Sequence, residues 1–167
     1  MERYMFFNSF NGDRVYDAAD FASYFSKLVS NGIFYTITTN LKVSAGTDMT
    51  VIVAAGSAWI NGYSYENTTD LTLTVPAANG INDRIDRVVL RWSNLDRDIQ
   101  LAVKTGTAAA SPTPPALTRN GDIYELGLAD VKVDRAAASI PSGNISDTRL
   151  DTNLCGTVNA LISAVYQ

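Results

Sequence analysis

Residues 82–106, NDRIDRVVLRWSNLDRDIQLAVKTG, alternate apolar and polar side chains in two runs. In each run the apolar residues share one parity: Val88, Leu90 and Trp92 in the first, Ile99, Leu101 and Val103 in the second. A period of two residues is the repeat of a β-strand, and a polar turn joins the runs, so the stretch predicts an antiparallel hairpin. Its arginines and aspartates are predicted to lie on a solvated face, where oppositely charged cross-strand pairs stabilise a sheet.

The same β pattern recurs from Ile33 to Val133. The strings FYTITTNLKVSA, MTVIVAAGSAWINGYSYEN and DLTLTV are rich in threonine and branched residues, and Asn61-Gly62 is typical of a two-residue hairpin turn. In YELGLADVKV the apolar parity changes after Leu128, which predicts a bulge near Ala129 or Asp130. About eight short strands at this spacing predict a mainly β fold, an antiparallel β-sandwich or barrel-like packing.

One helix is predicted before these strands. Asp17 is a suitable N-cap with Asp20 in the first turn, and Asn31-Gly32 supplies the stop. Between them an apolar stripe recurs at helical spacing, formed by Phe21, Phe25, Leu28 and Val29. A stripe this aromatic has to pack on the chain's own sheet or on a neighbouring subunit, so Phe21, Phe25 and Leu28 are candidate interface residues.

A second, short C-terminal helix is predicted within residues 151–167. Its apolar stripe consists of Leu154, Val158, Leu161, Ile162 and Val165. A helix of about a dozen residues is marginal alone, so it would dock on this domain or pair with copies of itself, with Val158, Leu161 and Val165 at the seam. The expected division is a helix-plus-sandwich domain over residues 1–150 and an amphipathic helix over 151–167. Whether the chain continues into a longer fibre stays open.

The segment TGTAAASPTPPALTRNGD interrupts the strands. Pro112, Pro114 and Pro115 lack a backbone donor and hold the chain extended, so it is not the interior of a strand. It is either a stiff connecting loop or an arm that lies on a partner subunit, and the sequence favours neither.

Composition removes several classes of function. The 167 residues suit one domain, and the chain has no histidine, which removes the usual general base and the commonest metal ligand. Cys155 is the single cysteine, so no internal disulfide or thiolate cluster forms, and its expected role is that of a small buried residue. Glycine-rich phosphate loops are absent. We therefore expect no cofactor, no metal site and no enzymatic activity.

Charge and hydropathy exclude other partners. The net charge is −4 and the arginines are interleaved with aspartates, whereas a nucleic-acid surface needs a concentrated cationic patch. The first 17 residues lack the basic region and apolar run of a signal peptide, and no stretch has membrane-spanning length. We expect no nucleic-acid binding, no membrane insertion and synthesis in a cytoplasm.

Three groups of strings, in this order, carry a family resemblance: GSAWINGYSYEN, DRIDRVVLRWSNLDRDIQLAVKTGTAAASPTPPALTRNGDIYELGLADVKV and ISDTRLDTNLCG. With the segment FNGDRVYDAADFASYFSKLVSNGIF, they resemble the N-terminal attachment domain of baseplate, tail-fibre and receptor-binding proteins of long-tailed phages and prophages of Gram-positive bacteria. The resemblance covers nearly the whole chain.

The resemblance implies a structural protein of the virion. It implies a shoulder-like β-sandwich with a helix that anchors receptor-binding parts to the tail tip or baseplate. The expected partners are other tail proteins and copies of the chain itself, with a trimer favoured because the similar receptor-binding proteins are trimeric, and a hexamer as the alternative. Host cell-wall polysaccharide would be bound through a region beyond the C-terminus, as in longer relatives.

Glycan binding and glycosidase activity are two alternatives to the structural role in a virion. Trp59, Tyr63 and Tyr65 surround the predicted turn and could stack on the sugar rings of a host glycan, although aromatic pairs across a hairpin are more often packing. A glycosidase would use a carboxylate pair such as Asp83 with Asp86 or Asp96 with Asp98. Nearness in sequence says nothing about the separation that this chemistry needs, so the glycosidase is the weaker hypothesis.

Overall fold

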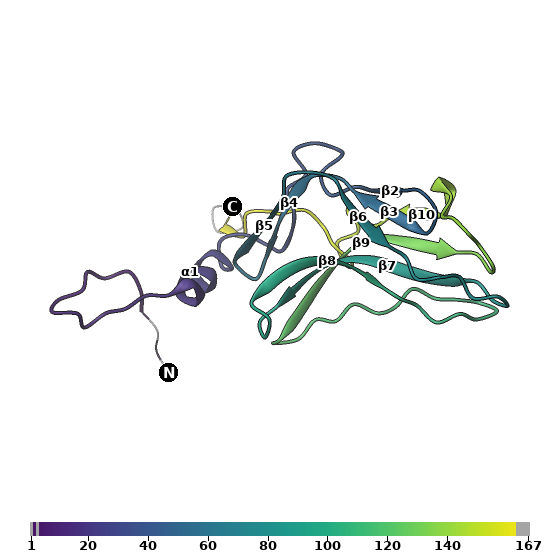
Figure 1. Ribbon diagram of the computed structural model, residues 1–167. Helices are drawn as coiled ribbons and strands as arrows, with labels where there is room; N and C mark the ends of the chain where they lie inside the picture. Colours follow the sequence, from purple (N-terminus) through teal and green to yellow (C-terminus); the bar gives the residue numbers. More distant parts are fainter. Residues whose placement is uncertain (1, 3, 163–167) are drawn as a thin grey trace.

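A computed structural model describes residues 2 and 4–162 (Figure 1). An extended N-terminal segment and one helix project from a body of antiparallel strands (Figure 1). The elements are α1 (Ala18–Phe25), β1 (Gly32–Ile33), β2 (Val43–Ala45), β3 (Thr50–Val53), β4 (Gly56–Ile60), β5 (Tyr63–Asn67), β6 (Leu71–Thr74), β7 (Arg84–Ser93), β8 (Asp98–Lys104), β9 (Ile123–Val133), the 3-10 turn η1 (Ser142–Asn144) and β10 (Ile145–Asp147).

The strands form three small antiparallel sheets, which confirms the mainly β prediction. Their orders are β1-β4-β5, β2-β3-β6 and β10-β9-β7-β8. The predicted hairpin is β7 with β8, where Leu90 pairs with Leu101, and Leu126 of β9 lies on the other side of Leu90. One buried apolar cluster takes residues from all three sheets, including Ile33, Val51 and Leu128. Burial of this cluster is the main force that holds the sheets together.

The helix begins where the sequence predicts. The Asp17 side chain accepts a hydrogen bond from Asp20 N–H (3.0 Å), and the Asp20 side chain accepts one from Asp17 N–H (3.2 Å), which makes a capping box. The helix ends at Phe25, before the predicted stop at residues 31–32. Lys27 and Leu28 instead donate to carbonyls three residues back, as in a 3-10 turn, and Val29 then bridges to Ala160.

The predicted turn at Asn61 and Gly62 is confirmed. Both residues have positive φ, 51° and 86°, as a type I′ hairpin turn requires. The helix packs directly on this turn, since a Cβ added to Gly62 would lie 1.9 Å from the carbonyl oxygen of Ala22. The turn therefore fixes both the register of β4 with β5 and the seat of α1.

The predicted bulge is present in β9, one residue earlier than Ala129. Val88 of β7 pairs with Ala129 and Val89 pairs with Gly127, so Leu128 is the extra residue. The bulge keeps Leu126 and Leu128 in the core before the shift and Val131 in the core after it.

The prediction that the charged face of the β7–β8 hairpin is solvated is wrong for several of its charges. Within the hairpin Arg84 is 5% exposed, Arg87 is 6% exposed and Asp86 is 0% exposed, and Asp86 shares the parity of Val88 and Leu90. Glu125 of the neighbouring strand β9 is also 0% exposed. The proline segment, residues 105–118, folds back over these charges: Gly106 N–H bonds to Asp86, and Thr118 N–H bonds to Glu125. Because this cover comes from the loop between β8 and β9, alternation along one strand could not predict it.

The predicted C-terminal helix is wrong for the described part of the segment. Residues 151–162 contain turns and isolated bridges and nothing more helical than a 3-10 turn. Gly156 has a φ of 79°, and Thr157 then bridges to Ile33 while Ser30 N–H donates to Asn159. The backbone groups of this segment are satisfied beside β1, which replaces the hydrogen bonds that a helix would supply.

None of the helices in the part of the chain that the structure describes is both long and apolar enough to cross a membrane.

Candidate functional site

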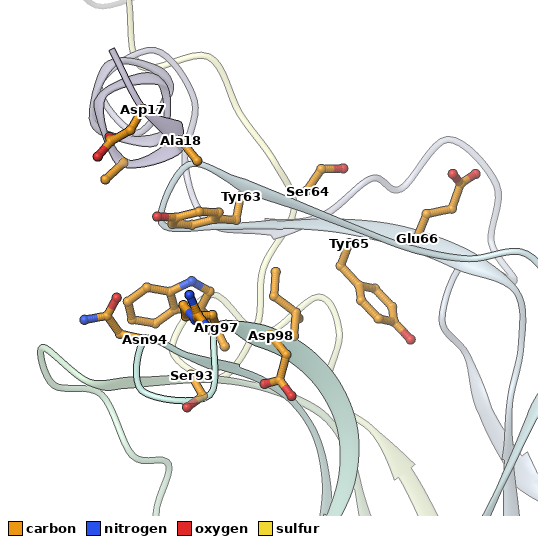
Figure 2. Close-up of a pocket in the computed structure, with 13 residues that line it drawn as sticks. Asp17, Ala18, Tyr63, Ser64, Tyr65, Glu66, Ser93, Asn94, Arg97 and Asp98 are labelled. Carbon is orange, nitrogen blue, oxygen red and sulfur yellow. The ribbon is translucent and has the colours of Figure 1, made fainter. Parts of the chain in front are cut away.

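A cleft of about 870 Å³ opens between two walls of the β body (Figure 2). One wall is β5 with the first residues of α1, and the other is the end of β7, the β7–β8 turn and the start of β8. The lining residues are Asp17, Ala18, Ala19, Tyr63, Ser64, Tyr65, Glu66, Trp92, Ser93, Asn94, Arg97, Asp98 and Ile99. This volume is within the range of small-ligand clefts.

The aromatic part of the cleft follows from the register of the β4–β5 hairpin. Tyr63 pairs with Ile60 and Tyr65 pairs with Ala58, and both partners are core residues, so the tyrosines face inward. Tyr63 lies against Trp92, with ring centroids 5.8 Å apart and planes tilted by 33°. Tyr65 points toward the opposite wall while Ser64 and Glu66 point away from it (Figure 2). Burial raises the pKa of Tyr65, which keeps its hydroxyl a donor at neutral pH.

The polar part of the cleft comes from the β7–β8 turn. Arg97 occupies the left-handed region with a φ of 56°, a conformation that favours glycine or asparagine, and its guanidinium forms no ion pair with any described residue. The Asn94 side-chain amide likewise makes no hydrogen bond within the described chain, although Asn94 N–H bonds to Asp122. Asp98 accepts a hydrogen bond from Gln100. Donors and acceptors thus remain available for a ligand.

The structure brings together two of the three aromatic residues predicted to contact glycan. Trp59 pairs with Ser64 and lies on the opposite side of the hairpin from Tyr63 and Tyr65. There its ring makes edge contacts with Phe25 at 5.7 Å and Phe34 at 6.4 Å. Its indole nitrogen is buried and has no hydrogen-bond partner among the described residues. The tryptophan that lies beside Tyr63 in the cleft is therefore Trp92, and the predicted Trp59 does not line the cleft.

Sequence reasoning missed Trp92, Asn94 and Arg97 as cleft residues. The parity of Trp92 predicted a core residue, which the structure confirms, since Trp92 belongs to the core cluster and is 9% exposed. Asn94 and Arg97 belong to a string that predicted only a turn. The cleft forms because β5 lies opposite the β7–β8 turn, about thirty residues away in sequence, and local patterns do not report such a contact. The one local feature of the sequence that could have indicated this cleft is Trp92 next to the polar turn.

A second surface feature lies on the N-terminal arm, defined as residues 4–16, and on α1. Phe6 packs against Phe21 (5.3 Å) and Tyr24 (5.1 Å), which joins the arm to the helix. The exposed aromatic residues form what we call the arm surface: Tyr4, Phe6, Phe7, Phe10, Phe21, Tyr24 and Phe25. Phe10 is 77% exposed and Phe7 is 60% exposed. The arm points away from the β body (Figure 1).

The predicted interface residues take different positions. Phe21 and Phe25 are exposed on the arm surface, whereas Leu28 is half-buried. Val158 is half-buried beside β1, and Leu161 is exposed. Val165 lies outside the described residues.

The proline segment lies on the sheet of its own chain. Pro112, Pro114 and Pro115 are half-buried, and the Pro115 carbonyl accepts a hydrogen bond from Arg87 Nη1 (2.9 Å). Lys104 Nζ donates to Thr118 Oγ1 (2.9 Å) at the end of the segment. These contacts are those of a connecting loop that covers its own sheet, and contact of the prolines with a partner subunit stays a prediction.

The two carboxylate pairs considered for glycosidase chemistry make local contacts. Asp86 is buried, where its side chain accepts hydrogen bonds from Arg84 Nε and Gly106 N–H. A hydrogen bond from Arg135 N–H, and then one from Lys132, lower the pKa of Asp83. Asp96 accepts a hydrogen bond from Ser93 Oγ (2.7 Å). The lowered pKa of Asp83 is opposite to the raised pKa of a glycosidase general acid.

Comparisons with protein-family models, curated proteins and solved structures give no significant match.

Proposed function

We propose that this protein is a non-enzymatic attachment domain of a phage tail tip or baseplate, which anchors receptor-binding parts to the tail. The arm surface carries this proposal. Monomeric soluble proteins rarely expose large contiguous apolar patches, and a patch of aromatic rings on a projecting arm is typical of a surface that another protein covers. The strings that resemble tail-fibre and baseplate domains support a phage tail as the assembly in this proposal.

Under this proposal the protein is part of the virion, is made in the host cytoplasm and acts as an oligomer. A trimer is favoured, with a hexamer as the alternative order, and the other partners are tail and baseplate proteins. The proposal includes packing of the three sheets as one shoulder-like β-sandwich. The proposal also includes binding of host polysaccharide by the assembled fibre through a region beyond this domain.

Self-association of the purified chain tests the proposal. Multi-angle light scattering over a concentration series is expected to give a closed oligomer for the wild-type chain. The double variant Phe7→Ser/Phe10→Ser removes two exposed rings of the arm surface and is expected to shift the protein to monomer without loss of the fold, because both rings lie outside the core cluster.

The matched control is Ile81→Ser/Leu95→Ser, which removes two equally exposed apolar side chains from the β body. This control is expected to keep the wild-type oligomer. A wild-type chain that stays monomeric at all concentrations, or a control that dissociates as completely as the arm variant, would refute the role of the arm surface.

A further inference from the structure

The cleft between β5 and the β7–β8 turn has unlike walls. Tyr63 and Tyr65 give it aromatic surface, and Asn94, Arg97 and Asp98 give it planar polar groups (Figure 2). Trp92 also lines it but is 9% exposed. Ligand sites combine apolar lining with a few convergent polar groups in this way. The ordinary alternative is a gap between imperfectly packed sheets, and the binding experiment below distinguishes the two. At the edge of the cleft the exposed side chains of Arg97 and Asn94 have no protein partner among the described residues, which leaves their polar groups accessible to a ligand.

The aromatic wall suits a sugar ring. One face of a pyranose presents C–H groups that are slightly positive, and the face of an aromatic ring is negative, so the two surfaces attract each other. Tyr and Trp also pair an apolar body with a polar tip, and the hydroxyls of Tyr63 and Tyr65 make no hydrogen bond with the described residues. A purely hydrocarbon ligand would leave these hydroxyls unsatisfied.

The polar wall suits vicinal hydroxyl groups. A guanidinium offers donors in a fixed fork, a carboxylate offers two acceptor oxygens, and an amide offers both donors and an acceptor. Asn94 and Arg97 of the β7–β8 turn and Asp98 at the start of β8 supply these three kinds of group, with Asn94 and Asp98 on opposite sides of Arg97 (Figure 2). Each sugar hydroxyl can donate a hydrogen bond to a carboxylate or amide oxygen and accept one from a guanidinium or amide N–H.

The charge of the cleft limits the kind of saccharide. Glu66 points away from the opposite wall, so the charges that remain in the lining are the carboxylates of Asp17 and Asp98 and one cation, Arg97, a balance of one minus two, or −1. An anionic glycan, such as a phosphate-containing or uronic polymer, would meet net repulsion. A neutral saccharide avoids this cost.

We propose that this cleft binds a neutral saccharide of a few pyranose rings, with the half-buried Tyr63 and Tyr65 as the stacking surface and Asn94, Arg97 and Asp98 as hydrogen-bonding groups. Trp92 is 9% exposed and packs against Tyr63, so it supports this surface from the core. The site is in the described domain itself and is independent of the arm surface. It also differs from the aromatic cluster expected from the sequence, because Trp59 lies outside it and the β7–β8 turn supplies the polar wall.

Tryptophan fluorescence can report on this cleft. The chain contains two tryptophans, Trp59 and Trp92, and only Trp92 lines the cleft. The variant Trp59→Phe leaves Trp92 as the sole emitter and removes the buried indole N–H that lacks a partner. Circular dichroism and thermal unfolding check that this parent variant is folded. The probes are maltotriose, cellotriose and tri-N-acetylchitotriose as neutral trisaccharides, trigalacturonic acid as the anionic one, and an uncharged Gly-Ser-Thr hexapeptide.

The expected result is a saturable change in Trp92 emission with at least one neutral trisaccharide, at a Kd on the order of 1 mM or tighter. Adding Tyr65→Phe is expected to weaken binding by about fivefold, the effect of one neutral hydrogen bond. Adding Arg97→Gly is expected to weaken binding by about tenfold or more, the effect of one hydrogen bond to a charged group.

Arg97→Gly separates binding from folding. Glycine adopts the positive φ of this position without a Cβ penalty, so the turn is kept when the guanidinium is removed. Its matched control is Ala136→Gly, which makes the same backbone change at a φ of 55° on an exposed residue outside the cleft. The control is expected to bind as the parent does.

Three results would overturn the proposal. One is the lack of a saturable signal with all three neutral trisaccharides in a folded parent. Another is tighter binding of trigalacturonic acid or the hexapeptide than of every neutral probe. The last is parental affinity in both Arg97→Gly and Tyr65→Phe.

Discussion

Arg87 and Asp130 form a bidentate ion pair between β7 and β9, with Nε–Oδ1 at 2.6 Å and Nη2–Oδ2 at 2.9 Å. The third nitrogen of the guanidinium donates to the carbonyl of Pro115. The pair therefore links two central strands to the segment that covers them. A planar fork of donors makes arginine suited to this double role, which lysine could not fill.

Removal of Asp130 is expected to destabilise the fold. Asp130→Ala leaves the Arg87 charge nearly buried without its partner, and breaking such a pair costs about 3 kcal/mol in the free energy of unfolding. Urea denaturation measures this loss. The matched control Asp122→Ala removes an exposed carboxylate and is expected to change stability by less than about 0.5 kcal/mol. Equal stabilities of the two variants would contradict a structural role for the ion pair.

Glu125 is expected to make stability depend on acid pH. Burial alone would raise the pKa of this carboxyl, but hydrogen bonds from Lys104, Thr118 N–H and Arg91 outweigh burial and lower it. A lowered pKa in the folded state means that the contribution to stability is fully present above the unfolded value, about 4.3, and is lost as the pH falls through the folded pKa.

The variant Glu125→Gln isolates this contribution. It is expected to be less stable than wild type by about 2 kcal/mol at neutral pH, because hydrogen bonds to a charged acceptor are replaced by weaker ones. The gap in unfolding free energy is expected to close as the pH falls below about 4. Chemical denaturation at a series of pH values measures the gap. A gap that stays constant or widens on acidification would show that the carboxylate charge is not stabilising.

The sequence predicted those parts of the fold that rest on local patterns. The β7–β8 hairpin follows from parity, the Asn61-Gly62 turn from its need for positive φ, and the start of α1 from Asp17. It did not predict the burial of Glu125, because the covering residue Thr118 is brought there by a loop. The cleft and the pairing of Thr157 beside β1 are also contacts between distant segments, and the spacing of apolar residues near the C-terminus was equally compatible with a helix.

Cys155 is expected to be chemically inert in the native protein. Burial raises the pKa of its thiol to about 12, so almost no thiolate is present near neutral pH. A disulfide reagent such as DTNB, used at about pH 8, is expected to react slowly with the folded chain and rapidly in concentrated guanidinium chloride. The single cysteine makes the absorbance change unambiguous. Equally fast labelling in both conditions would mean that the thiol is accessible in the folded state.

Gly62 is expected to tolerate no side chain, because the helix rests on it. Gly62→Ala introduces a Cβ at a φ of 86° and places it 1.9 Å from the carbonyl oxygen of Ala22, so the turn is strained and α1 has to move. We expect a loss of about 2 kcal/mol or more in unfolding free energy. The controls Gly80→Ala and Gly121→Ala place a Cβ in open space and are expected to be nearly neutral in unfolding free energy.

Movement of α1 in Gly62→Ala would also separate Phe25 from Trp59. The emission of Trp59, measured in a Trp92→Phe background, is therefore expected to change. If Gly62→Ala matched its controls in both stability and emission, the β4–β5 turn would not be the seat of the helix, and the arm surface would lack its support on the β body.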